Sequence, residues 1–307
     1  MTTPTPPKPR RTPAQTTALV NKLFAGAPLT PLVPTAEFLA LIAELGIEFE
    51  PGDLEKLGLY LAALLHANAA FNLTAINSPD QAWSRHIFDA LTLMPLLAEV
   101  PQVIIAAEPP EQLTPSHPAP AARLIDIGSG GGLPAIPLAI TLPHIHFTLV
   151  EPTGKKATFL RSVVELLGLT NVTVLQDRAE RLGQNYRHHR EMYHFATARA
   201  VAPLPTLAEY LSAFLGIGGL AIAVKGERAE QEIIDSQHAL ATLGLEHSAT
   251  VVTPTGQLIV LEKIEPTPKP YPRRDGEPKR VPLGSAPVSK ANPNQAARPI
   301  NPIKKRK

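Results

Sequence analysis

The chain has 307 residues, 44% of them hydrophobic, so it is long enough to bury one sizeable core or two small ones. It contains no cysteine, which excludes disulfides, zinc–cysteine sites, iron–sulfur clusters and a thiolate nucleophile. The net charge of +2 is the sum of segments with opposite net charges. Residues 35–265 carry 14 basic and 25 acidic residues, net −11, whereas residues 1–34 are net +4 and residues 266–307 are net +9.

The 34 prolines are about twice the usual share, and they concentrate in three stretches. We predict a disordered basic arm over residues 1–34, a surface loop over 101–121 and a disordered basic tail over 266–307. Ends of this composition either bind nucleic acid or only keep a protein soluble, and both interpretations stay open. No apolar stretch reaches the ~18 residues that a membrane helix needs, so no membrane partner is expected.

Residues 35–100 are expected to form a helical N-terminal extension. Apolar residues such as Leu57, Leu61 and Leu64 recur at spacings of three and four over residues 35–75, and a similar pattern covers 80–98. From residue 123 onward, short apolar runs alternate with helical patterns. This alternation predicts an α/β domain over 122–265 with a mostly parallel sheet. The expected strands are 123–128, 146–151, 172–176, 194–198, 220–225, 248–252 and 257–263, and the expected helices are 134–141, 154–167, 205–215 and 228–243.

The stretch LIDIGSGGGLP, residues 124–134, joins the first strand to the first helix of this domain. A glycine-rich turn at this point lets the backbone approach a ligand at the edge of the sheet. The dinucleotide fingerprint G-x-G-x-x-G fails, because its sixth position is Leu133, and no Gly-Lys-Ser/Thr follows to make a phosphate-binding loop. The stretch does fit D-x-G-x-G-x-G, which resembles the first motif of class I methyltransferases, enzymes that bind S-adenosylmethionine.

The ends of the next two strands carry acidic residues. Glu151 ends the second strand, 25 residues after Asp126, and a carboxylate there can accept hydrogen bonds from both hydroxyls of a ribose. LQDRAERL follows the third strand, and we expect it to lie beside an adenine. Three strand ends directed at one nucleoside are more specific than any one of them.

Several motifs in order resemble the bacterial ribosomal RNA small subunit methyltransferase G family, also called glucose-inhibited division protein B. They are FNLTAINSPDQAWSRHIFDAL, LIDIGSGGGLPAIPLAI, FTLVEPTGKKATFLRSV, LQDRAERL, TARAVAPL and AVKGE, and the match runs from about residue 38 to 264. YPRRDGEPKRVPLG is similar to a C-terminal extension of cyanobacterial members.

The resemblance implies a class I, Rossmann-like fold and a cytoplasmic enzyme, expected to be a monomer. Its reaction transfers a methyl group from S-adenosylmethionine to N7 of a guanine in 16S rRNA near the decoding centre. The substrate is 16S rRNA or the 30S ribosomal subunit.

The resemblance also implies which residues contact the cofactor. They are Gly128 and Leu133 in the loop, Glu151, Pro152 and Thr153 on the ribose side, Ala179 and Glu180 on the adenine side, and Arg199 after the fourth strand. No metal site and no catalytic acid or base is implied. Asn72, His86 and Asp89 belong to the N-terminal signature, and we interpret them as polar ties to the core.

The residues themselves narrow the chemistry. Methylation of a pyrimidine C5 generally needs a cysteine, which is absent, and the N-P-P-Y-like turn typical of amine methylation is replaced by ARAVAPL. Guanine N7 already carries a lone pair, so alignment and a dry pocket suffice. Three alternatives remain: a methyltransferase of a small molecule or protein, an NAD oxidoreductase, which Leu133 disfavours, and a non-catalytic RNA chaperone.

Overall fold

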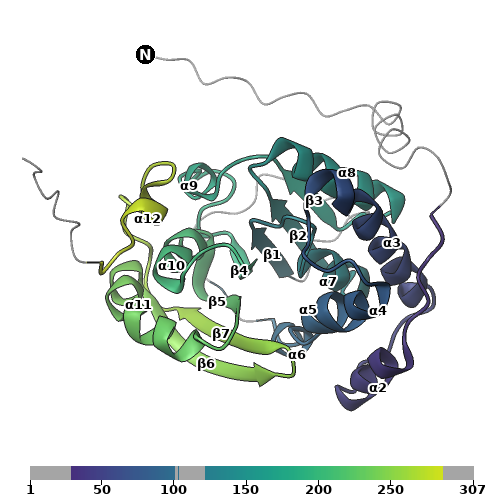
Figure 1. Cartoon of the computed structure of the whole chain (residues 1–307). Coiled ribbons are helices and arrows are strands. Elements are labelled where there is room, and N and C mark those ends of the chain that lie inside the picture. Colours follow the sequence, from purple (N-terminus) through teal and green to yellow (C-terminus); the bar gives the residue numbers. More distant parts are fainter. Residues whose placement is uncertain (1–28, 101–102, 104–121, 286–307) are drawn as a thin grey trace, which may run out of the picture.

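The computed structural model describes residues 29–100, 103 and 122–285 (Figure 1). Most of the predicted N-terminal arm, nearly all of the 101–121 loop and the tail from residue 286 lie outside this part of the chain. Among the described helices, none is long and apolar enough to cross a membrane.

A seven-stranded sheet forms the centre of the molecule, in the order β3-β2-β1-β4-β5-β7-β6. The first five strands are parallel, and β7 runs antiparallel to both of its neighbours. This mostly parallel sheet confirms the predicted α/β class I methyltransferase fold. The strands are β1 (Ala122–Ile127), β2 (Ile145–Val150), β3 (Val172–Leu175), β4 (Tyr193–Arg199), β5 (Leu215–Lys225), β6 (Leu245–Thr253) and β7 (Gly256–Lys263).

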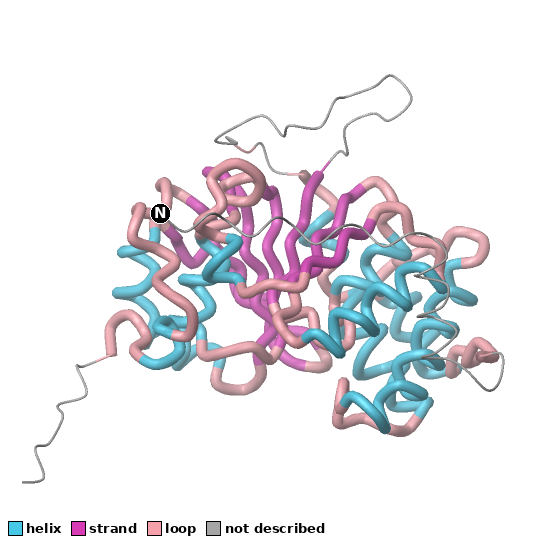
Figure 2. Tube along the Cα trace, turned by 90° about the horizontal axis from the view of Figure 1, so that it is seen from above, coloured by secondary structure: helices cyan, strands magenta, loops and turns pink. Residues whose placement is uncertain are grey.

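Helices cover both faces of the sheet (Figure 2). Neighbouring residues of β1 serve different faces, because successive side chains of a strand point in opposite directions. Leu124 packs under α7 (Ala135–Thr141) and α8 (Gly154–Leu166), whereas Ile125 packs under α9 (Ala179–Leu182), α10 (Leu204–Ser212) and α11 (Ala229–Leu243). The central strand is thus buried on both sides, which explains its nearly continuous apolar sequence.

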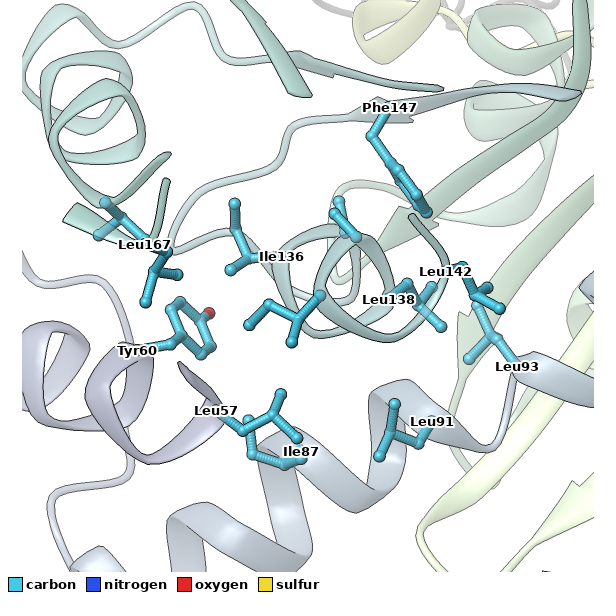
Figure 3. Close-up of a cluster of buried hydrophobic side chains, with 14 of the residues drawn as sticks. Leu57, Tyr60, Ile87, Leu91, Leu93, Ile136, Leu138, Leu142, Phe147 and Leu167 are labelled. Atoms are coloured by element: carbon cyan, nitrogen blue, oxygen red, sulfur yellow. The ribbon is translucent and has the colours of Figure 1, made fainter. Parts of the chain in front are cut away.

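The N-terminal extension shares its core with the sheet domain. Side chains of α3 and of the helical turns that follow it pack directly on α7 (Figure 3): Leu57, Tyr60, Ile87 and Leu91 lie against Ile136 and Leu138. The extension therefore forms a second helical layer over the face of the sheet that α7 and α8 cover. It comprises α2 (Ala36–Glu44), α3 (Asp53–Phe71), α4 (Pro79–Ala82), a wider π-type turn (Trp83–Phe88), α5 (Asp89–Leu91) and α6 (Met94–Leu97).

Several boundaries differ from the prediction, and the largest differences lie around β5 and in the tail. The expected helix 205–215 ends at Ser212, and β5 begins at Leu215, five residues earlier than expected, because the glycines at 216, 218 and 219 hide the apolar pattern. The expectation of a disordered tail from residue 266 onward is wrong for residues 266–285. They form what we call the C-terminal segment, which includes α12 (Glu277–Arg280) and packs beside α10. Buried side chains of the sheet domain form hydrogen bonds with the backbone of the segment. These contacts hold the segment in place although its composition is rich in proline and charge.

Candidate functional site

The glycine-rich loop between β1 and α7 requires its glycines. Gly128, Gly130 and Gly132 adopt φ values of 70°, 54° and 94°, which residues other than glycine rarely adopt. A Cβ on Gly128 would lie 2.8 Å from Val201 Cγ2, so this loop and the turn after β4 are in close contact. Leu133, the other predicted contact of the loop, is half-buried at its end. The loop thus lies at the carboxyl edge of the sheet, where doubly wound folds bind ligands.

Glu151 fixes this loop to the end of β2. Its side chain is 4% exposed, and its two oxygens accept hydrogen bonds from Gly130 N at 3.0 Å and Thr153 N at 2.7 Å. Each oxygen has a further lone pair, so the carboxylate can also accept from ligand hydroxyls. Pro152 and Thr153, predicted to be on the ribose side, are exposed next to it.

Asp126 lies beneath the loop and is fully buried. Its Oδ1 accepts a hydrogen bond from Thr197 Oγ1 at 2.8 Å, whereas its Oδ2 is buried without a partner. Burial raises the pKa of Asp126 to about 7, since desolvation disfavours the charged carboxylate, and the nearby Glu151 adds to the effect. The motif D-x-G-x-G-x-G includes Asp126, but the prediction gave it no contact with the cofactor.

The N-terminal extension reaches this loop through a residue that the sequence did not single out. Tyr60 of α3 is fully buried, and its hydroxyl donates a hydrogen bond to Gly131 O at 2.8 Å. A Cβ on Gly131 would lie 2.9 Å from Leu64 Cδ1, so the absence of a side chain there leaves room for the same helix. Apolar periodicity places Tyr60 on the buried face of a helix, but nothing in the pattern indicates what its hydroxyl contacts.

Arg199, at the end of β4, joins the sheet to the N-terminal extension. Its guanidinium lies 2.8 Å from Asp89 Oδ2 and donates a hydrogen bond to Arg85 O at 3.0 Å. Asp89 also accepts a hydrogen bond from Thr255 in the turn between β6 and β7. Of the other signature residues, Asn72 ends α3 in a left-handed conformation and His86 is hydrogen-bonded to Thr74 at 2.8 Å.

Ala179 and Glu180 begin α9, directly after β3, and both are buried. The Glu180 carboxylate points to the C-terminal segment. It accepts hydrogen bonds from Gly276 N at 2.8 Å and from Tyr210 Oη at 3.5 Å. The structure thus brings Gly128, Glu151 and the turn after Arg199 to one edge of the sheet, while the side chain of Glu180 is engaged elsewhere.

A cavity of about 860 Å³ opens beside Arg199, between the N-terminal extension and the carboxyl ends of β4 and β5. Arg85 and Arg228 are exposed at it, whereas Lys225 is held by Glu232 at 2.7 Å and by Ala202 O at 2.8 Å. The volume suits a nucleobase with part of its backbone.

Comparison with known proteins identifies the family. A family model described as rRNA small subunit methyltransferase G (GidB) matches residues 53–106 and 112–260. The chain is 42% identical over 244 residues to the ribosomal RNA small subunit methyltransferase G of Sorangium cellulosum, covering 80% of this chain and 94% of that protein. It is 37% identical over 251 residues to that of Leuconostoc citreum, covering 80% and 98%. The chain belongs to this family.

Membership confirms the predicted reaction class, which is methyl transfer from S-adenosylmethionine to a guanine N7 of 16S rRNA. Solved structures of other methyltransferases are more distant. The antibiotic-resistance methyltransferase Kmr is 18% identical, with a TM-score of 0.39 that covers 47% of this chain and 88% of that chain. A mutant 16S rRNA (adenine(1408)-N(1))-methyltransferase of Catenulisporales acidiphilia is 15% identical, with a TM-score of 0.41, covering 48% and 87%.

Proposed function

We propose that this chain methylates N7 of a guanine in 16S rRNA near the decoding centre, with the cofactor at the glycine-rich loop and the guanine in the cavity beside Arg199. The observation that carries this proposal is the contact between the two places. Val201 lines the cavity and also lies against Gly128 of the loop. A methyl group bound at the loop would therefore be close to a base in the cavity.

The residues at the loop fit S-adenosylmethionine. The glycines leave room for close backbone approach, and the Glu151 carboxylate has the lone pairs to accept from ribose hydroxyls. Asp126 lies beneath the loop with one oxygen unpartnered, so a positively charged ammonium bound at the loop would favour the ionised form of this carboxyl. We assign Leu133, Pro152 and Thr153 to the same site, with Ala179 and Glu180 at its adenine side.

The chemistry requires little beyond alignment. S-adenosylmethionine supplies a methyl group bonded to a positively charged sulfur. Guanine N7 has a free lone pair, so no residue has to remove a proton before attack, and no catalytic base is assigned. The task of the chain is to hold the two reactants in line and to exclude water. Arg199, which the family resemblance assigns to the cofactor, also fixes the extension against the sheet at the cavity, through Asp89 and the Arg85 carbonyl.

RNA binding needs positive charge, because residues 35–265 are net −11. Arg85 and Arg228 are exposed at the cavity, and Lys155 is exposed at the start of α8, so these side chains are placed to meet phosphates. The basic N-terminal and C-terminal stretches would add affinity that falls with salt. If deletion of residues 286–307 left the affinity for rRNA and its salt dependence unchanged, this role of the tail would be wrong.

Further parts of the proposal come from the family resemblance. The substrate is the assembled 30S subunit or free 16S rRNA, the enzyme is a cytoplasmic monomer, and the motif YPRRDGEPKRVPLG supports a cyanobacterial type. Each has a direct measurement: activity on particles against naked RNA, light scattering, fractionation, and comparison with cyanobacterial sequences.

The central test uses the full chain, radiolabelled S-adenosylmethionine and 30S subunits from a strain that lacks the modification. Chemical cleavage at N7-methylguanine should reveal one labelled site in 16S rRNA. An Arg85→Ala, Arg228→Ala double variant should raise the KM for subunits, whereas Glu246→Ala, an exposed residue on β6, should not. Cofactor binding without transfer to rRNA would refute the substrate assignment and favour a small molecule or protein.

A further inference from the structure

The C-terminal segment, residues 266–285, lies beyond the region that the family model matches, which ends at residue 260. We propose that it positions the turn between β3 and α9, and thereby sets the affinity for S-adenosylmethionine. This inference rests on the proposed function, because that function assigns the same turn to the adenine side. The positioning residue on the segment is Asp275, and its counterparts are Arg178 and Arg181.

The first part of the segment is firmly attached to the domain. Arg190, only 2% exposed, donates hydrogen bonds to the carbonyls of Thr267 at 2.6 Å and Tyr271 at 2.7 Å. Glu209, which is fully buried, accepts from Arg273 N at 2.7 Å and forms an ion pair with its guanidinium at 2.6 Å. Buried charges that are paired in this way fix the position of the backbone that carries them.

The next residues of the segment contact α9 (Figure 1). Asp275 lies 2.5 Å from Arg181 and 3.7 Å from Arg178, and the following Gly276 N donates to Glu180 Oε1 at 2.8 Å. Gln184 Nε2 donates to Pro272 O at 2.8 Å, so the contact continues past the end of the helix. The segment therefore contacts α9 along its whole length.

Apart from the segment, α9 is held by Ala179 and Leu182, which are buried in the core, and by Arg190, which donates a hydrogen bond to Gly183 O at 2.9 Å. α9 has four residues, too few to be stable in isolation, and it follows β3, the strand at one edge of the sheet. The side chains of β3 are only half-buried. Since Ala179 and Glu180 are assigned to the adenine side, movement of α9 would change the shape of that side of the cofactor site.

The experiment replaces Asp275 in the full chain and measures the affinity for S-adenosylmethionine by calorimetry. Asp275→Lys puts a cation opposite two arginines, so Kd should rise about fivefold or more, with a smaller rise for Asp275→Asn. Asp275→Glu keeps the carboxylate and should bind within twofold of wild type. Backbone amides of residues 176–184 should exchange faster in Asp275→Lys, while kcat at saturating cofactor stays unchanged.

Glu246→Lys makes the same charge change at an exposed position on β6 and should leave Kd unaltered. The inference is overturned if Asp275→Lys binds the cofactor like wild type, if Glu246→Lys weakens binding equally, or if Asp275→Glu fails to retain affinity. Failure of the proposed function is seen separately, because it would leave wild-type cofactor binding intact while no guanine in 16S rRNA is methylated.

Discussion

Replacement of Asp126 by asparagine should change how the stability of the protein depends on pH. The native Asp126 carboxyl is fully buried with one oxygen unpartnered, and burial raises its pKa from 3.8 to about 7. The native state therefore holds this proton more tightly than the unfolded state does. Between pH 4 and 7 the free energy of unfolding must fall as pH rises, as far as this group contributes.

The size of the effect follows from the same pKa values. At 1.36 kcal/mol per pH unit, the interval from 3.8 to about 7 corresponds to about 4 kcal/mol. An asparagine side chain cannot ionise, so the Asp126→Asn variant should lack this loss. Its amide leaves a buried donor without a partner at a cost of about 1–3 kcal/mol, but that cost is the same at every pH. The variant should thus be less stable at pH 4 and should gain several kcal/mol relative to wild type by pH 8.

Urea unfolding of both proteins at half-unit steps from pH 4 to 8 measures this difference. Glu246→Gln, an exposed carboxyl replaced in the same way, provides a reference whose difference from wild type should not vary with pH. If the Asp126→Asn difference also stayed constant within about 1 kcal/mol, Asp126 would be ionised at pH 5 in the native state. Burial would then not control its charge, and the reasoning would be wrong.

Three further substitutions test the site. Gly128→Ala should raise the Kd for S-adenosylmethionine at least about tenfold, because the added Cβ would lie 2.8 Å from Val201 on a left-handed backbone. A second change in the same chain, Val201→Ala, should restore part of the affinity. No recovery would exclude the steric cause. Asp89→Asn should lower the free energy of unfolding by about 1–3 kcal/mol, since Asp89 is nearly buried and Arg199 partly exposed. An Asp89→Leu, Arg199→Met double variant should cost less than the sum of the single changes, and strict additivity in urea unfolding would contradict the pairing. Tyr60→Phe should cost about 1 kcal/mol by urea unfolding, because it leaves a loop carbonyl unpaired; unchanged stability would show that this hydrogen bond contributes nothing.

The parts of the fold that depend on local pattern could be predicted from the sequence. The strand, glycine-rich turn and helix around residue 128 follow from one continuous stretch, and Glu151 is recognisable as the polar end of an apolar run. β5 was predicted too short because glycines interrupt its apolar pattern. In the missed part, Leu215 pairs with Tyr193 of β4 before a register shift, and pairing with β7 begins only at Leu220.

The contacts between distant segments could not be predicted. The hydroxyl of Tyr60 and the ion pair of Arg199 with Asp89 join residues that are far apart in the chain. The C-terminal segment looked disordered because proline and positive charge dominate its composition. Its order depends on Arg190 and Glu209, two buried charges whose partners are in the segment itself.

The two halves of the site differ in how far apart in the sequence their contacting residues lie. The cofactor loop is closed by Glu151, which bonds to an amide 21 residues before it, whereas the cavity rim needs Asp89 to meet Thr255, 166 residues later. Chains emerge from the ribosome N-terminus first, and nearby contacts form faster than distant ones. During synthesis the cofactor loop can therefore be in place well before the rim that receives the guanine. A newly made chain would thus form the ribose side of the cofactor site first, and would complete the rim and the adenine side, which depends on Asp275, only near the end of synthesis.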